Sequence, residues 1–191
     1  MRLGVFGGTF DPPHIGHLIV AQDAWSALGL DQVLFIPAAE PPHKLDRTIT
    51  PAPLRLAMLR AAIGTDERFA ISDLELRRGG PSYTVDTLRE LGSLHRDAEL
   101  FLLIGADQLR EFESWREPEE IRKLATVVGF ARGGDDLDAG GAARSIQVTR
   151  VDVSATEIRR RVADGEPIRY LVPSGVEEII RREQLYRRRP G

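Results

Sequence analysis

The sequence predicts an α/β domain built on a doubly wound parallel sheet with helices on both faces. Three observations predict this class. Short apolar runs alternate with segments that repeat apolar residues every three or four positions, the pattern of successive β-α units. Runs such as "LFLLIG" (100–105) are apolar throughout, so their strands should be buried on both faces. Glycines stand where helices should end, at Gly29, Gly64 and Gly165.

The predicted elements follow one another along the whole chain. Strands are expected at 3–6, 32–38, 69–76, 100–105, 126–131 and 145–151. Helices are expected at 14–29, 53–64, 83–95 and 155–165. Two stretches, 38–53 and 133–145, have the composition of long loops. No linker or repeat divides the chain, so we expect a single Rossmann-like domain over residues 1–191, with ligands beyond the carboxyl ends of its strands.

The composition excludes several classes of protein. The chain has 191 residues, a formal net charge of −3 and no cysteine. Without cysteine there is no disulfide, thiol nucleophile or cysteine-bound zinc. The charge offers no general attraction to nucleic acid or to an anionic membrane, and the arginines of "RREQLYRRRP" (181–190) are typical of a basic helix end. No apolar run approaches the roughly 20 residues of a membrane span, and nothing resembles a signal peptide, so the cytoplasm is the expected compartment.

The run "GVFGGTFDPPHIGHL" (4–18) carries the clearest chemical signal. A glycine pair follows a buried strand and precedes a helix start, and main-chain N–H groups at such a turn attract anions. His14 and His17 are three residues apart, so both imidazoles lie on one side of the first helical turn, and Gly16 keeps that side open to a phosphate. We expect a phosphate site with two imidazole donors. A metal site would lack a nearby third ligand, and purely structural histidines would not need so extended a motif.

Within this run, "GGTFDPPHIGH" (7–17) resembles the signature of the H-x-G-H nucleotidyltransferase superfamily. That superfamily transfers nucleoside monophosphates and shares ancestry with class I aminoacyl-tRNA synthetases. A synthetase would need several hundred residues and a second, lysine-rich signature, which this chain lacks. The resemblance implies one nucleotidyltransferase domain over residues 1–191. It also implies that ATP is bound by Gly7, Gly8, Thr9, Phe10, His14 and His17.

A second stretch, "DVSATEIRRR" (152–161), resembles the superfamily's other signature, which binds ATP phosphates. The resemblance assigns Ser154, Thr156 and Arg159 to the β- and γ-phosphates. The residues themselves favour a helix start, because Ser154 and Glu157 form a capping-box pattern, and helix starts bind anions. The alternative is that Ser154 only caps the helix and that the arginines form a solvated face.

Further stretches resemble one branch of the superfamily, the bacterial nicotinate-mononucleotide adenylyltransferases. They are "PPHK" (41–44), "PSYTVDTL" (81–88), "GADQLREFESW" (105–115) and "YLVPSGVEEIIRREQLY" (170–186). The resemblance implies that the mononucleotide is bound by Lys44, Tyr83, Thr84 and Trp115. It implies that Gly105 and Asp107 contact ATP.

These assignments suit the residue types. A helix start at Tyr83 and Thr84 offers N–H groups and a hydroxyl to a carboxylate. The indole of Trp115 can stack on a pyridine ring, and Asp107, at the end of a buried strand, suits recognition of nucleotide hydroxyls. The alternatives are that Trp115 packs beneath its loop, that Asp107 is a plain helix cap, and that Lys44 is simply exposed.

The implied reaction joins the AMP moiety of ATP to nicotinate mononucleotide, giving nicotinate adenine dinucleotide and pyrophosphate in NAD biosynthesis. We expect direct in-line attack, with His17 at the α-phosphate, His14 on the phosphate chain and Arg159 on the β- and γ-phosphates. Mg²⁺ should arrive with ATP. The alternatives are a covalent nucleotidyl-histidine, nicotinamide mononucleotide as the substrate, and a nucleotide sensor without catalysis. Whether the chain forms a homo-oligomer is left open.

Overall fold

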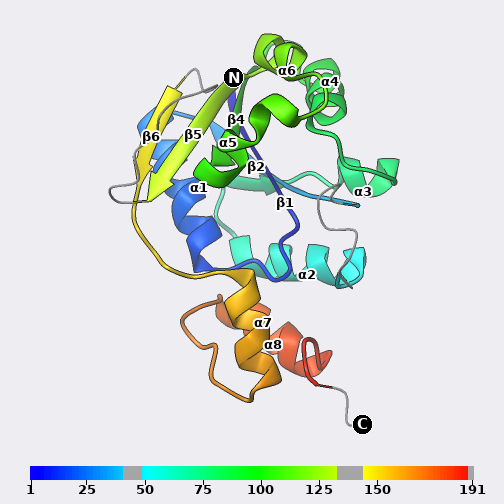
Figure 1. Cartoon of the computed structure of the whole chain (residues 1–191), viewed down its shortest axis with the longest axis vertical. Helices are drawn as coiled ribbons and strands as arrows, with labels where there is room; N and C mark the ends of the chain where they lie inside the picture. The colour runs from blue at the N-terminus through cyan, green and yellow to red at the C-terminus, as the bar shows by residue number, and fades with distance from the viewer. Residues whose placement is uncertain (41–48, 133–143, 189–191) are drawn as a thin grey trace.

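A computed structural model of the chain describes residues 1–40, 49–132 and 144–188. Its strands are β1 (Arg2–Gly8), β2 (Gln32–Pro37), β3 (Phe69–Ile71), β4 (Glu99–Gly105), β5 (Thr126–Arg132) and β6 (Arg144–Val148). All pair in parallel in one six-stranded sheet of order β3-β2-β1-β4-β5-β6 (Figure 1). The order reverses between β1 and β4, and ligands of doubly wound sheets bind at such a switch point. The predicted fold class is confirmed.

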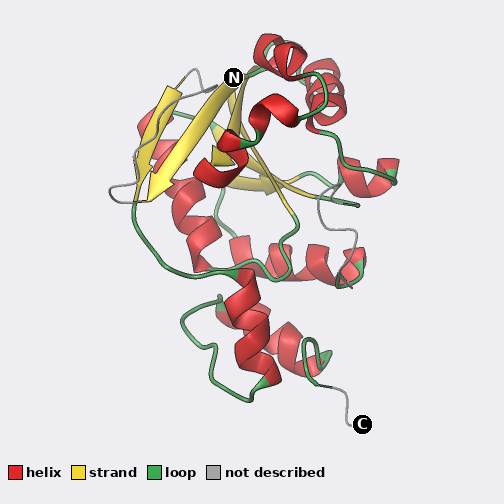
Figure 2. Ribbon diagram, in the orientation of Figure 1, coloured by secondary structure: helices red, strands yellow, loops and turns green. Residues whose placement is uncertain are grey.

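Helices cover both faces of this sheet (Figure 2). One face packs against α1 (Ile15–Leu28) and α2 (Ala52–Ile63), and the other against α4 (Thr84–Leu94) and α6 (Pro118–Leu124). Successive residues of β4 alternate between the two cores: Phe101 belongs to the first, and Leu102 to the second. The central strands are therefore buried on both sides, which is why their sequences are apolar at every position.

The strand predicted over 69–76 is wrong in its second half. β3 ends at Ile71, and a short helix, α3 (Leu74–Arg78), follows. The carbonyl of Asp73 accepts a hydrogen bond from the N–H of Arg77 at 2.9 Å, which opens the helical turn. Alternating apolar residues in so short a run fit a strand and a helical turn about equally well, and in the helical turn Leu74 is fully buried.

The carboxyl-terminal part forms a third hydrophobic cluster beside the sheet cores. Two helices, α7 (Ala155–Ala163) and α8 (Ser174–Arg182), pack there against α2, with Met58, Ile158 and Val176 fully buried between them. Figure 1 shows both helices beyond α2, on the side away from the sheet. Because α2 also contributes to the first sheet core, it joins this cluster to the rest of the fold.

Two shorter helical segments follow β4 and form one wall of the site described below. They are α5 (Ala106–Arg110) and the 3-10 turn η1 (Phe112–Ser114). Neither was predicted, and α6 and α8 were not predicted either. Among the described residues, no helix combines the length and apolar character that a membrane span requires.

Candidate active site

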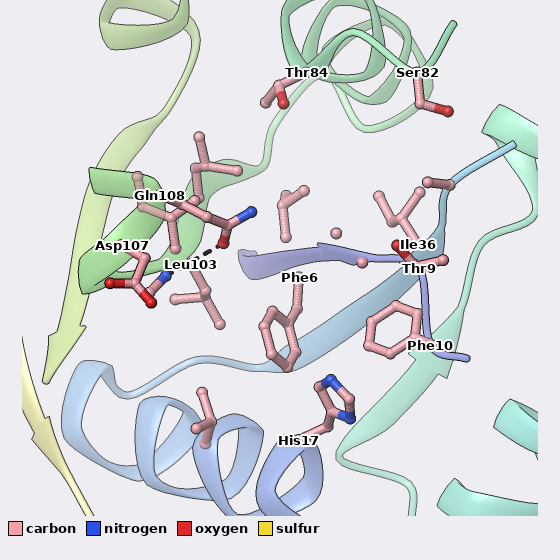
Figure 3. A pocket seen from close by; sticks show the side chains of 18 of the residues that line it. Phe6, Thr9, Phe10, His17, Ile36, Ser82, Thr84, Leu103, Asp107 and Gln108 are labelled. Atoms are coloured by element: carbon pink, nitrogen blue, oxygen red, sulfur yellow. Dashed lines mark hydrogen bonds between the residues drawn. The ribbon is translucent and has the colours of Figure 1, made fainter. Parts of the chain in front are cut away.

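A cavity of about 1580 Å³ opens at the carboxyl ends of the central strands. The ends of β1, β2 and β4 contribute Gly7, Gly8, Ile36 and Gly105 to its wall (Figure 3). Its volume exceeds the roughly 300–1,000 Å³ that usually encloses one small ligand. The cavity therefore lies where the sheet order reverses and has space for two nucleotides.

His17 projects from the first turn of α1 into this cavity, below Phe6 and Phe10 (Figure 3). The ring of Phe10 lies 5.1 Å from the imidazole, at an interplanar angle of 70°. The main-chain N–H of His14 donates to Nδ1 of His17 at 3.1 Å. Because Nδ1 accepts this hydrogen bond, the neutral ring carries its proton on Nε2. The fold thus selects the tautomer whose donor is Nε2–H.

His14 lies behind His17. Its side chain is buried, and its ring stacks on that of His17 with centroids 3.7 Å apart and planes inclined by 29°. A Cβ on Gly16 would lie 3.1 Å from the His14 ring, so this glycine makes space for the stacked pair. We expected Gly16 to admit a phosphate, and the structure adds this second reason for it. Contact of His14 with the phosphate chain stays a prediction.

The loop between β1 and α1 turns sharply at Phe10. Its φ of 48° lies in the left-handed region, which is unfavourable for a bulky residue. The turn sends the phenyl ring back into the core, where it is 2% exposed. A Cβ on Gly8 would approach that ring to 2.9 Å. Gly8 is therefore required by the packing of Phe10. Gly7, Gly8, Thr9 and Phe10 all line the cavity, and their contact with ATP stays a prediction.

The second signature lies at the start of α7. The hydroxyl of Ser154 accepts a hydrogen bond from the N–H of Glu157 at 3.1 Å, so the predicted N-cap is confirmed. The Glu157 carboxylate pairs with Arg160 and Arg161 instead of completing a capping box. Hydrogen bonds from these two guanidinium groups lower the pKa of Glu157 to about 2.

Arg159 reaches the cavity wall from this helix. Its Nη1 donates to the carbonyl oxygen of Asp11 at 2.7 Å, and its Nη2 donates to the hydroxyl of Thr156 at 3.1 Å. Arg159 thus contacts the loop between β1 and α1 (9–14), called the signature loop below, at a residue 148 positions earlier in the chain. Ser154 and Thr156 are exposed, and they lie beside the cavity rather than on its wall.

The opposite side of the cavity is lined by Tyr83, Thr84 and Trp115. Tyr83 is the N-cap of α4 and Thr84 its first residue, so the first N–H groups of this helix have no acceptor within it. Trp115 is half-buried and packs on Phe112 at 5.4 Å between ring centroids. Trp115 therefore packs on its own loop and also lines the cavity, and its stacking on a pyridine ring stays a prediction. The guanidinium of Arg116, which also lines the cavity, lies 4.8 Å from the Tyr83 ring.

Glu75 is a buried carboxylate on this side that the sequence analysis missed. It accepts a hydrogen bond from the hydroxyl of Thr87 at 2.5 Å. Burial raises the pKa of Glu75, and hydrogen bonds from Thr87 and Ser82 oppose that rise. Ser82 also accepts from the N–H of Ala39 at 2.9 Å, which ties the end of β2 to the segment preceding α4. The wrong strand prediction hid Glu75, because it placed this residue in the sheet.

A third part of the wall follows β4. Gly105 is the N-cap of α5, and its N–H lies 3.4 Å from the side-chain oxygen of Gln108 (Figure 3). Asp107 stands in the first turn of that helix, with its side chain 92% exposed and paired with Arg110. The cap position belongs to Gly105, so the alternative of Asp107 as a plain cap is wrong. Lys44 lies outside the described residues.

Sequence reasoning assigned no role to Asp11, although this residue belongs to the signature. Asp11 is 6% exposed and lines the cavity. Its carboxylate accepts hydrogen bonds from the N–H of Thr50 at 3.1 Å and from the hydroxyl of Tyr186 at 2.5 Å. Its place in the signature was the available signal, but its partners are distant in the sequence.

Comparisons with known proteins agree with this geometry. The model of the cytidylyltransferase-like family matches residues 5–161, which defines the class of protein. A Thermus thermophilus protein named "Probable nicotinate-nucleotide adenylyltransferase" is 48% identical over 98% of this chain and 100% of the relative. A Shouchella clausii protein of the same name is 44% identical over 97% of this chain and 96% of the relative. The chain belongs to the nicotinate-nucleotide adenylyltransferase family.

The fold is also similar to that of a solved structure, the Plasmodium falciparum nicotinic acid mononucleotide adenylyltransferase complexed with NaAD. The TM-score is 0.81, and the match covers 97% of each chain at 18% identity. At that identity the likeness establishes the shared fold.

Proposed function

We propose that this protein joins the AMP moiety of ATP to nicotinate mononucleotide, giving nicotinate adenine dinucleotide and pyrophosphate in NAD biosynthesis. One observation carries the proposal. A single cavity is lined on one side by the signature loop with His17 and on the other by Tyr83, Thr84 and Trp115. Two substrates bound in that cavity can react without leaving it. Because ATP and pyridine mononucleotides are cytoplasmic metabolites, we propose the cytoplasm as the compartment.

The chemistry we propose is direct transfer. An oxygen of the mononucleotide phosphate bonds to the α-phosphorus of ATP, while the bond from that phosphorus to the oxygen of the leaving pyrophosphate breaks. No covalent bond to the protein is needed. Alignment of bound reactants can lower a barrier by about 7–11 kcal/mol in favourable cases, and donors directed at the developing charge lower it further.

We assign the α-phosphate to His17. Because Nδ1 accepts the hydrogen bond from the N–H of His14, Nε2 is the ring atom left to donate to the phosphate. We propose that Nε2–H donates to a non-bridging oxygen, where negative charge increases during transfer. His14 supports this ring from behind and completes the phosphate site.

The phosphates that leave are assigned to Arg159, Ser154 and Thr156. Mg²⁺ enters as part of the ATP substrate, held by phosphate oxygens and water. Among the described residues, no three His, Asp or Glu side chains are grouped as metal ligands. The Asp11 carboxylate on the wall already accepts two hydrogen bonds, so it is engaged in holding the loop.

The nicotinate ring and its carboxylate are assigned to the other side. The amino terminus of α4 at Tyr83 and Thr84 presents N–H groups and a partial positive charge to the carboxylate. Trp115 presents its aromatic face to the pyridine ring. Asp107, whose carboxylate is exposed on the wall after β4, accepts hydrogen bonds from nucleotide hydroxyls.

The test is pyrophosphate release by the full chain from ATP with either mononucleotide. We expect release that requires both substrates and is faster with nicotinate than with nicotinamide mononucleotide, because only nicotinate carries the carboxylate. Release with neither would leave a nucleotide-binding protein without this activity. Ping-pong kinetics, or a trapped adenylyl-protein, would overturn direct transfer in favour of a covalent route.

A further inference from the structure

The carboxyl-terminal segment is fastened to the signature loop by hydrogen bonds that the proposed chemistry does not use. The N–H of Ile15 donates to the carbonyl oxygen of Leu171 at 3.1 Å. The hydroxyl of Tyr186 donates to the carboxylate of Asp11 at 2.5 Å across 175 positions of sequence. Tyr186 is the last residue of the stretch "YLVPSGVEEIIRREQLY", for which the proposed reaction gives no role.

Asp11 collects contacts from three separate parts of the chain. Its carboxylate holds Tyr186 and the N–H of Thr50, while its carbonyl oxygen accepts from Arg159. The buried Arg55 donates to the carbonyl oxygens of Thr50 and of residue 9 of the signature loop, at 2.9 Å each. These contacts tie the loop to the rest of the chain, and the loop lines the side of the cavity to which we assign ATP.

Tyr186 itself stands outside the cavity wall. It is half-buried and packs against the carboxyl-terminal cluster. Burial and the nearby negative charge of Asp11 raise the pKa of the Tyr186 hydroxyl, so the group stays a donor across the physiological range. A hydrogen bond from such a group to a carboxylate is charge-assisted and is stronger than one between neutral groups.

We infer that Tyr186 is a positioning residue for ATP: through Asp11 it holds the signature loop and Arg159 in the arrangement that binds the triphosphate. The carboxyl-terminal segment thereby sets nucleotide affinity without touching the nucleotide. The inference rests on the proposed function, because it takes ATP as the ligand of the signature loop. It assigns no role to Tyr186 on the mononucleotide side, where the ring and carboxylate of nicotinate bind.

The test uses Tyr186→Phe in the full chain, which removes one hydroxyl and keeps the packed ring. We expect the Kd for ATP, measured by calorimetry, and the KM for ATP to rise about tenfold, as loss of one charge-assisted hydrogen bond predicts. The KM for nicotinate mononucleotide should change by less than about twofold, because distant sites behave independently. Tyr170→Phe is the matched control, since Tyr170 lies in the same segment and is 80% exposed.

A double-variant comparison separates positioning from simple stabilisation. In an Arg159→Gln background, the additional change Tyr186→Phe should have little further effect on the Kd for ATP, because both residues act through the same loop. Asp11→Asn removes the charge of the acceptor in the same hydrogen bond, and it should also weaken the binding of ATP more than the binding of the mononucleotide. Lower thermal stability with both affinities unchanged would show a purely structural contact and overturn the inference.

The two proposals fail in different measurements. If the wild-type chain released no pyrophosphate, the proposed function would fall. If the wild-type chain were active while Tyr186→Phe bound ATP as tightly as Tyr170→Phe does, the function would stand and the positioning role would fall. Should Tyr186→Phe be unfolded at the assay temperature, the Kd of Asp11→Asn for ATP decides by the same comparison.

Discussion

The two ends of the cavity are held in place by different means. At the end that we assign to ATP, the nucleotide end, the imidazole of His17 is fixed by a main-chain N–H, by the stacked ring of His14 and by Phe10. At the end that we assign to nicotinate mononucleotide, the mononucleotide end, the segment before α4 is held by side-chain hydroxyls around the buried carboxylate of Glu75. The first end positions its imidazole through a main-chain N–H and stacked rings, and the second is organised around a buried carboxylate whose pKa is raised.

This difference separates chemistry from recognition. A donor locked by the main chain can stabilise the transition state without reorganising, which is the condition for a large catalytic effect. The segment before α4 contributes to binding of the mononucleotide in the ground state. Substitution of the residues that hold this segment should therefore change the KM for the mononucleotide. Loss of the His17 donor should therefore alter kcat, and changes at the other end should alter the KM for the mononucleotide.

The largest effect is expected for His17→Ala. Loss of a donor directed at the developing charge should lower kcat by about 10²–10³-fold, as for other oxyanion-type donors. The KM for ATP should change by only a few-fold, because Arg159 and the main-chain amides still bind the phosphates. Steady-state kinetics with varied ATP measure both constants.

The control for this variant is His95→Ala. His95 directly follows α4, before the amino end of β4, and so stands at the opposite end of the strand from the cavity. Its removal should leave kcat within about twofold of wild type, as for surface substitutions away from a site. Unchanged turnover in His17→Ala would show that His17 has no catalytic role. The two ends of the cavity would then not differ in their effect on kcat.

The two ends also differ in how far the sequence could predict them. The nucleotide end is carried by one continuous run, in which the glycines, the histidine spacing and the helix start lie within 4–18. Local geometry therefore predicts the placement of His17. The tautomer could not be predicted, because it depends on which atom accepts the N–H of His14.

Long-range contacts account for what the sequence did not reveal. The sequence pattern around Glu75 is typical of a strand, whereas the structure has a short helix there, with Leu74 buried. The contact of Asp11 with Tyr186 spans 175 positions, and no periodicity in one sequence can indicate it. The sheet could be predicted from local sequence, because a run that is apolar at every position indicates by itself a strand buried on both faces.

An intermediate effect is expected for Trp115→Leu. Leucine keeps apolar contact with Phe112 but has no aromatic face, and stacking of a base on an aromatic ring contributes about 1–3 kcal/mol. The KM for nicotinate mononucleotide should therefore rise about tenfold or more, with the KM for ATP unchanged. Trp115→Phe should recover part of the loss. Equal increases in both KM values would mean that Trp115 only packs, and the mononucleotide end would need another stacking surface.

The smallest effect on activity, and the clearest dependence on pH, is expected for Glu75→Gln. The amide keeps one acceptor for Thr87 or Ser82 and loses the other, so the KM for the mononucleotide should rise about threefold, as for one hydrogen bond. The effect on kcat should be small, because Glu75 acts on the segment before α4 and not on His17. Glu177→Gln is the matched control, since it removes the same charge from a half-buried position on α8, which does not line the cavity.

The pH dependence of stability tests whether Glu75 is the titrating group at this end. Burial raises the pKa of Glu75 in the folded chain above its value in the unfolded chain, so the folded chain binds this proton more tightly. Its contribution to the free energy of unfolding is fully present below the ordinary glutamate pKa, and it is lost as pH rises through the raised pKa. Glu75→Gln carries no such proton, so the free energy of unfolding of wild type relative to the variant should fall as pH rises through that window. Denaturant titrations at several pH values measure this difference, and a difference independent of pH would show that Glu75 is not the titrating group at the mononucleotide end.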